Sequence, residues 1–273
     1  MTMNIEITRE QLEEIVPSMV VSSDDIFNEL SDFFVRAQNY LERVSGVNII
    51  SAPSEELVKL CRRYVCQVAV YEYIPQRDLV ITPNGFGVVS DANIAPASKE
   101  RVENLRHRLA VDCFASLGEV IDAIRNLRDT AWEQSLAPIN AVPHLVCNAR
   151  HLSVYCGVPE PTKDDYVSRI HLIMDAENDI ISEIGYTQFS LLLTAARCAS
   201  YSVNQLAVIR KLRCAIGQHV QGMPKAASLE FIRQAVNMMK DVPSDFTAYF
   251  DSPEYRAKSV NYENRKEDSC YFF

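Results

Sequence analysis

The sequence predicts a mainly α-helical protein, and three observations lead to that prediction. Apolar residues recur at helical spacing along nearly the whole chain, as between Ile26 and Val44. Ser, Thr or Asp stands before several of these stretches and glycine follows some of them, which is the pattern of capped helices. Hydrophobic residues make up 48% of the 273 residues, whereas Gly and Pro number only 8 and 12, a composition typical of a globular helical chain.

The first part of the chain predicts three helices. Thr8 to Gln11 has the sequence of a capping box and opens a short helix. A longer helix is expected from about residue 22 to Gly46, which is placed to end it in the left-handed conformation. A third helix begins after Ser54 and is expected to stop before Pro75, because proline disfavours the helical conformation of the residue that precedes it.

Residues 79–90 predict a small β-hairpin in this otherwise helical chain. Leu79 to Ile81 is an apolar, β-branched run, and Pro83-Asn84-Gly85 supplies residues that tolerate a tight turn. A second apolar run with Phe86 and Val88 follows the turn. A lone two-stranded hairpin is marginally stable in water, so we expect another surface to cover it. Ser98 then caps a helix that is expected to reach about residue 135, with Gly118 as a candidate break.

The second half of the chain predicts further helices after the proline-rich linker 157–161. Their expected ranges are about 164–184, 188–201, 203–220 and 226–240. The predicted domains are a unit over 1–156 that carries the hairpin, a helical unit over 162–240, and an extended C-terminal tail over 241–273. The tail is rich in charge, and its composition up to residue 269 is typical of a segment that is disordered in isolation.

A shared pattern predicts that the two helical units are a tandem duplication. Ala37, Asn39 and Gly46 are spaced as Ala176, Asn178 and Gly185 are, and an Asp pair precedes each set. Residues 22–74 and 162–204 would then be related units. The alternative is that two amphipathic helices share this pattern by coincidence.

Composition limits the classes of function. The net charge of −9 argues against non-specific binding to nucleic acid, which needs clustered Lys and Arg. The first residues do not have the pattern of a signal peptide, and no apolar run approaches the about 20 residues of a membrane helix. None of the eight cysteines forms a C-x-x-C pair, so buried, reduced thiols in a reducing compartment are expected.

One cluster has the residue types of a metal site. His144, Cys147, His151 and Cys156 are all potential zinc ligands, and Cys147 and His151 can share a helical face. Their spacing is not that of a known zinc module, and apolar residues alternate with them. A packed helix with ordinary His and Cys residues is therefore the favoured interpretation, and we predict no metal, cofactor or catalytic residue. A metal-dependent enzyme that uses this cluster is the alternative.

Two features favour contacts with another chain: the hairpin and the tail with its aromatic residues. The only tryptophan falls late in a predicted helix and belongs either to the core or to an interface. The candidate interface residues are Phe86, Val88, Trp132, Tyr255, Tyr262, Tyr271, Phe272 and Phe273.

Several stretches resemble proteins of tailed phages. The segment from Asp24-Asp25 through Ala37-Gln38-Asn39-Tyr40-Leu41-Glu42 to Gly46 resembles the small helical head–tail connector proteins. Residues 79–108, with Gly85-Phe86-Gly87 and Asn93 to Ser98, are similar to an uncharacterised family encoded by phages and prophages of gut anaerobes. The endings Asp251-Ser252-Pro253, Tyr262-x-Asn264 and Tyr271-Phe272-Phe273 are also similar to that family. The second helical unit departs from the single-unit connectors.

The resemblance implies a non-enzymatic structural protein of the virion. It would be an adaptor in the neck that forms an oligomeric ring and joins the portal to the tail. Its partners would be copies of itself, the portal protein, and tail or neck proteins, without a membrane and without sequence-specific nucleic acid. DNA could pass through the lumen of the ring. The protein would be assembled in the cytoplasm of the bacterial host and reside in the virion. A tail-completion or capsid accessory protein is the alternative within the same class.

Overall fold

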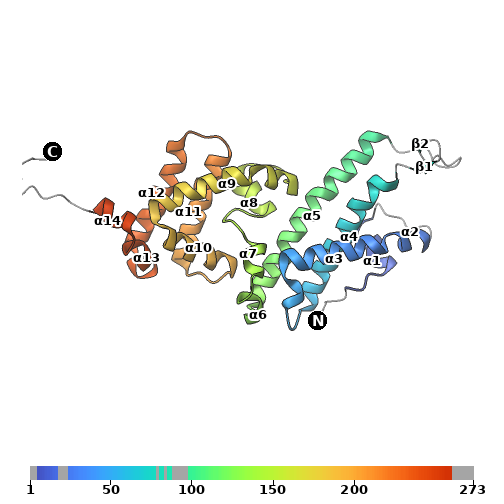
Figure 1. Ribbon diagram of the computed structural model, residues 1–273, viewed down its shortest axis with the longest axis horizontal. Coiled ribbons are helices and arrows are strands. Elements are labelled where there is room, and N and C mark those ends of the chain that lie inside the picture. The colour runs from blue at the N-terminus through green and yellow to red at the C-terminus, as the bar shows by residue number, and fades with distance from the viewer. Residues whose placement is uncertain (1–4, 18–23, 78–79, 83–84, 88–97, 260–273) are drawn as a thin grey trace, which may run out of the picture. The chain divides into compact units, whose positions relative to one another are not determined.

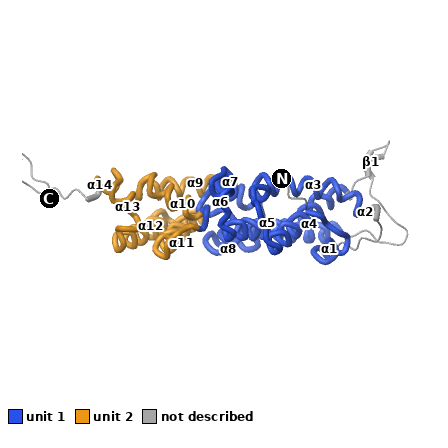
Figure 2. Tube along the Cα trace, turned by 90° about the horizontal axis from the view of Figure 1, so that it is seen from below, with its two compact units in different colours: residues 1–170, 197–199 blue, residues 171–196, 200–273 orange. Residues whose placement is uncertain are grey.

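The computed structural model describes residues 5–17, 24–77, 80–82, 85–87 and 98–259. This part of the chain is mainly helical, which confirms the predicted fold class (Figure 1). It divides into two compact units, of which unit 1 comprises residues 1–170 and 197–199, and unit 2 comprises residues 171–196 and those from 200 onward (Figure 2). The division falls at residue 170, whereas the sequence placed the linker at 157–161.

Unit 1 is built around three long helices, with α4 packed against both α3 and α5 (Figure 1). Its core is formed by the apolar faces of these helices, including Leu41, Cys61 and Val120, all of which are fully buried. The helices that begin in unit 1 are α1 Arg9–Ile15, α2 Asp24–Glu29, α3 Ser31–Ser45, α4 Glu55–Arg77, α5 Lys99–Leu127, α6 Thr130–Glu133, α7 Ala137–Ala141, α8 Ala149–Cys156 and α9 Lys163–Ile184, with a 3-10 turn η1 at Val47–Ile49.

The N-terminal end of the chain confirms one local prediction and corrects two others. The Thr8 side chain accepts a hydrogen bond from the backbone N–H of Gln11, which closes the predicted capping box. The long helix predicted up to Gly46 is divided into α2 and α3 at Leu30, whose side chain is fully buried. Helix α4 continues past Pro75 to Arg77, because a proline in the last turn removes few backbone hydrogen bonds.

Helix α5 is continuous through Gly118, where the sequence allowed a break. Its N-cap is Ser98, as predicted, and the Ser98 hydroxyl accepts a hydrogen bond from the N–H of Arg101. The helix ends at Leu127 rather than near residue 135, and α6 and α7 follow as separate short helices. Because α5 packs against α4 and α8, tertiary burial outweighs the low helix propensity of the single glycine.

The described strands form one small antiparallel pair, β1 Val80–Thr82 and β2 Gly85–Gly87. Val80 lies opposite Gly87 and Ile81 lies opposite Phe86. The other positions of the predicted hairpin range 79–90, including Val88, lie outside the described residues.

The C-terminal end of α3 is fixed by a contact between two residues that lie far apart in the sequence. Gly46 ends the helix with a φ of 67°, in the left-handed region that favours glycine. The indole N–H of Trp132 donates a hydrogen bond of 2.7 Å to the backbone carbonyl of Ser45, one of the last carbonyls of the helix. A Cβ atom on Gly46 would collide with the Cβ of Ala137. The close approach therefore depends on glycine.

Residues 197–199 join unit 1 through arginine side chains. The Arg125 guanidinium donates to the backbone carbonyl of Arg197 at 3.1 Å, and that of Arg128 donates to the carbonyls of Cys198 and Ala199. Arg197 itself donates to the carbonyl of Val142 at 3.0 Å. These charge-assisted hydrogen bonds tie the short segment to the ends of α5 and α7.

Unit 2 contains a closely packed pair of helices, α11 and α12. Gly222, with a φ of 70°, lies in the turn between them, and the buried Ser228 hydroxyl donates to the carbonyl of Ala215. The elements that follow α9 are α10 Tyr186–Arg197, α11 Val203–Val220, α12 Lys225–Asp241, η2 Pro243–Asp245, α13 Thr247–Phe250 and α14 Pro253–Ser259.

The prediction of an extended tail over 241–273 is wrong for its first part, which is helical up to Ser259. Phe246 and Tyr249 are each 1% exposed, so this segment buries enough apolar surface to fold. The Tyr249 backbone N–H also donates to the side-chain oxygen of the buried Gln188. The remaining residues, 260–273, lie outside the described residues.

The pattern that predicted a tandem duplication corresponds to a shared local structure. Ala37 and Ala176 are both buried, and Gly46 and Gly185 both end their helices with positive φ. The packing differs, because α3 packs closely along α4 whereas α9 and α10 form no comparable pair. The shared spacing therefore reflects similar helix ends, and it is not accompanied by the shared packing that a duplication requires.

Two glycine substitutions should act on stability in opposite directions. We expect Gly46→Ala to lower the free energy of unfolding by about 2–4 kcal/mol, because it adds left-handed strain and a collision with Ala137. Gly118→Ala should raise it by about 0.5–1 kcal/mol, because the new methyl group would make only ordinary contact with Asn148. Urea denaturation followed by circular dichroism measures both. A neutral Gly46→Ala would contradict the assigned close approach.

Candidate functional site

The structure describes two of the predicted interface residues in detail. Trp132 is 1% exposed within its own chain and lies in the core of unit 1, so of the two predicted alternatives, core or interface, the structure shows the core. Tyr255 is half-buried, and its ring contacts those of Tyr249 and Phe250 at centroid distances of 5.2 and 4.9 Å. The side chain of Phe86, together with Val88, Tyr262, Tyr271, Phe272 and Phe273, lies outside what the structure describes.

The four candidate metal ligands do not form one cluster. The Cys147 sulfur lies 4.0 Å from the Nδ1 atom of His151, and Asn148 between them caps α8 by accepting the N–H of His151. Among the described residues, no three His, Cys, Asp or Glu side chains gather closely enough to hold a metal ion, so His144 and Cys156 do not complete a site. The prediction that Cys147 and His151 bind no zinc stays a prediction.

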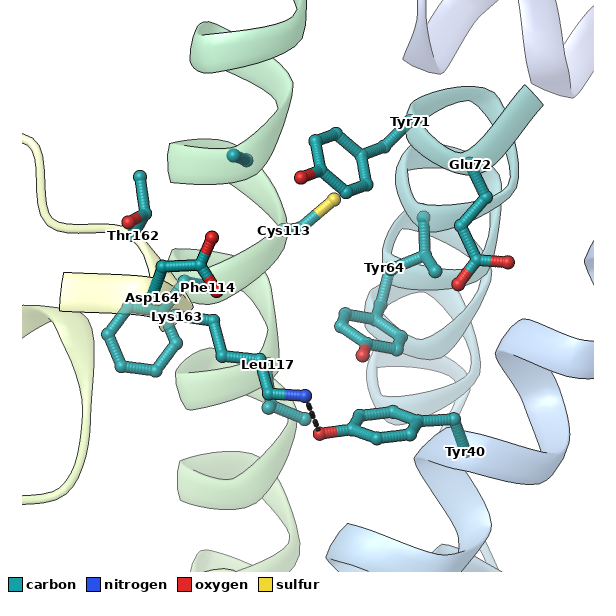
Figure 3. A pocket seen from close by; sticks show the side chains of 12 residues that line it. Tyr40, Tyr64, Tyr71, Glu72, Cys113, Phe114, Leu117, Thr162, Lys163 and Asp164 are labelled. Carbon is teal, nitrogen blue, oxygen red and sulfur yellow. Dashed lines mark hydrogen bonds between the residues drawn. The ribbon is translucent and has the colours of Figure 1, made fainter. Parts of the chain in front are cut away.

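Unit 1 contains a pocket of about 260 Å³ beside α5 (Figure 3). Tyr40 of α3, Tyr64 and Tyr71 of α4, and Phe114 of α5 supply aromatic walls. The segment Thr162 to Asp164, at the start of α9, closes one side of the pocket. Such a combination of apolar walls with a few converging polar groups is typical of a binding site.

Lys163 spans the pocket from the start of α9. Its ammonium group donates a hydrogen bond of 2.5 Å to the Tyr40 hydroxyl and lies 4.3 Å from the centroid of that ring (Figure 3). The helix start that carries Lys163 is well defined, since Thr162 and Asp165 exchange hydrogen bonds between their side chains and backbone N–H groups. These bonds, led by the Thr162 backbone N–H, lower the pKa of Asp165. The role of Asp165 is therefore helix capping.

Tyr64, a buried residue, presents its hydroxyl to the pocket. The residue is 4% exposed, and burial, followed by nearby Tyr40, Cys113 and Glu72, raises the pKa of its phenol. The hydroxyl points toward the space in front of Lys163 and Tyr40 (Figure 3). Within the described part of the chain no group makes a hydrogen bond to it. It is thus a neutral donor available to a group that enters the pocket.

A second cavity of about 220 Å³ adjoins the first. The two share the side chains of Tyr40, Phe114, Leu117 and Lys163 as lining residues. The second is also lined by Gly118 and Ile121 of α5, and by residues near α7 and α8. We call the two together the α5 groove, with a first lobe at Tyr64 and Ala110 and a second lobe at Gly118 and Ile121.

Unit 2 carries a separate, more polar cavity of about 370 Å³. Glu183, Arg233 and Lys240 supply its charges, and Tyr249 and Tyr255 its aromatic side. Burial is the first cause of a raised pKa at Tyr249, with Tyr255 and Glu183 contributing. This cavity explains the half-buried position of Tyr255, whose ring packs within its own unit.

The cysteines do not offer an activated nucleophile. Burial raises the pKa of Cys61, Cys66 and Cys113 to about 12, and that of Cys156 to about 11. At neutral pH these thiols are therefore protonated. Among the described residues the cysteines are free thiols, of which Cys61, Cys66 and Cys156 are buried and the others partly buried.

Sequence reasoning did not identify the α5 groove. One signal was present: Tyr64, Val68 and Tyr71 recur at helical spacing, and so do Ala110, Phe114 and Leu117. Each set marks one face of a helix. That the two faces stand apart far enough to leave a cavity follows only from the packed structure, as does the position of Lys163.

Comparison with known proteins places part of the chain in a wider context. Residues 21–139, less than half of the chain, match a family of unknown function, DUF6712. The match ends within α7 and so covers the α3, α4 and α5 walls of the groove. No curated protein and no solved structure matched the chain. Among the described residues, no helix is long and apolar enough to cross a membrane.

The raised pKa values predict the order in which the thiols react. We expect iodoacetamide at pH 8 to label Cys61, Cys66 and Cys113 last in the folded protein, because almost none of each is thiolate below a pKa of about 12. Cys214, which is only partly buried, should react earlier. Mass spectrometry of peptides after timed quenching gives the order, and urea-unfolded protein is the control. Early labelling of Cys113 would contradict its assigned burial.

Proposed function

We propose that this chain is a structural, non-enzymatic virion protein, a head–tail adaptor that forms an oligomeric ring in the neck and joins the portal to the tail. The resemblance of its first helical segment to small phage connectors motivates the proposal. Its partners would be copies of itself, the portal protein and tail or neck proteins. It would assemble in the cytoplasm of the bacterial host and let DNA pass through the ring lumen, a role that a net charge of −9 suits because few basic residues would hold the DNA.

The observation that carries the proposal is an exposed apolar surface on α7. Leu136 and Ile139 are 74% and 47% exposed and lie one helical turn apart, so that their side chains are neighbours. Adjacent exposed apolar side chains are a common mark of a contact with another chain. The β1–β2 pair adds a second candidate contact, because two strands of three residues bury little surface by themselves.

Electron microscopy of the purified protein tests the proposal. We expect closed rings with a central opening, either from the protein alone or after it is mixed with the portal protein encoded by the same genome. Sedimentation velocity over a range of concentrations gives the mass of the assembly independently. A monomer that forms no ring in either sample would contradict the proposed function.

The α7 surface can be tested separately. Leu136→Asp combined with Ile139→Asp should weaken assembly about tenfold or more, because it places charges in an apolar contact. Thermal unfolding should change little, because both side chains are exposed. Ser153→Asp on α8, an exposed position away from this surface, is the matched control. Assembly that is equally strong in the double variant would exclude α7 from the interface.

A further inference from the structure

We propose that the α5 groove is the docking site for the aromatic segment Tyr271 to Phe273 of a second copy of this chain. The inference rests on the proposed assembly and deepens it, because it names the site that receives the C-terminal arm. The groove supplies two adjoining cavities, and the segment supplies two aromatic side chains that an extended backbone would direct to the same side. Each part of this match comes from a different observation.

The volumes of the lobes fit aromatic rings. The first lobe holds about 260 Å³ and the second about 220 Å³. A cavity of about 150 Å³ in a protein core accommodates one benzene molecule, so each lobe has room for one phenyl or phenol ring. The rings of Tyr40 and Phe114 line both lobes and provide stacking or edge contacts.

The spacing of the aromatic residues fits two lobes side by side. In an extended segment, residues two positions apart point to the same side and lie about 7 Å from each other. Tyr271 and Phe273 have this relation, so one such segment can direct one ring into each lobe while Phe272 faces away. Lys163, which lines both lobes, would lie between the two rings.

The polar groups complete the match. Tyr64 as a residue is 4% exposed, and its hydroxyl makes no hydrogen bond within the described part of the chain, so it can donate to the phenol oxygen of Tyr271 in the first lobe. Glu72, Asp164 and Lys163 line that lobe with charges of both signs. The arm also carries both signs just before its aromatic residues, at Arg265-Lys266 and Glu267-Asp268. Each charge can therefore meet an opposite one.

A peptide-binding measurement tests the docking. The acceptor is the full chain carrying Tyr271→Ala and Phe273→Ala, so that its own arm does not compete. The probe is a fluorescein-labelled peptide of residues 260–273 with Cys270→Ser, followed by fluorescence anisotropy. We expect saturable binding at a 1:1 ratio. Tyr64→Phe in the acceptor should weaken it about threefold to tenfold, because it removes one hydrogen-bond donor.

A groove-filling variant localises the binding. Ala110→Trp places a large side chain in the first lobe and should abolish binding. Asn104→Trp, an exposed position of the same helix outside the groove, is the matched control and should bind normally. Circular dichroism melting shows whether each variant is folded. If Ala110→Trp does not fold, Gly118→Phe, which fills the second lobe, replaces it. Absence of peptide binding, or binding that a folded groove-filling variant retains, overturns the proposal.

A mixing experiment tests whether the arm comes from a second copy. One chain carries Ala110→Trp, which fills its groove, and has an intact arm. The other has an intact groove and carries Tyr271→Ala and Phe273→Ala in its arm. Neither should assemble through this contact alone, but their mixture should form a complex detectable by sedimentation velocity. A mixture that forms no complex overturns docking in a second copy. Rings that form without peptide binding contradict only the docking site, whereas peptide binding without rings contradicts only the proposed ring.

Discussion

The packing of α5 is the constraint on which unit 1 depends. This helix of 29 residues contacts α4 along one side, touches α3, and carries α8 on another side. Its buried residues, from Leu109 to Ile124, therefore face several partners at once. The α5 groove opens beside Ala110 and Gly118, where the neighbouring elements stand apart from the helix.

A hydrogen bond between Trp132 and Ser45 determines the positions of the helices around α5. The Trp132 indole bonded to the Ser45 carbonyl holds the end of α3 against α6 and α7, and Gly46 permits the approach of Ala137. Tyr40 lies little more than one helical turn before Ser45, so the same contact sets the position of the ring that Lys163 meets. The shape of the groove is thus a consequence of core packing. The same core holds α7, and therefore its exposed surface with Leu136 and Ile139, in place.

The sequence predicted what depends on local chemistry and missed what depends on tertiary contacts. The mainly helical class, the Thr8 capping box, the Ser98 cap and the glycine ends at Gly46 and Gly185 all follow from short-range rules. The stop expected before Pro75 was wrong because a proline in the last turn of a helix removes few backbone hydrogen bonds, and the break allowed at Gly118 is absent because packing outweighs helix propensity there. The tail up to Ser259 was called extended because charge dominates its composition, although Phe246 and Tyr249 anchor it. The groove combines side chains from five helices, and no local pattern brings them together.

The proposed function is that this chain joins the head to the tail, and deletion of its coding sequence tests that proposal most directly. The deletion is made in frame in the genome that encodes the chain, and the particles in an induced lysate are examined by electron microscopy. The account predicts DNA-filled heads and free tails that fail to join, with joining restored when the chain is supplied from a plasmid. Complete, infectious particles from the deletion, or a genome that yields no particles even when intact, would contradict the account.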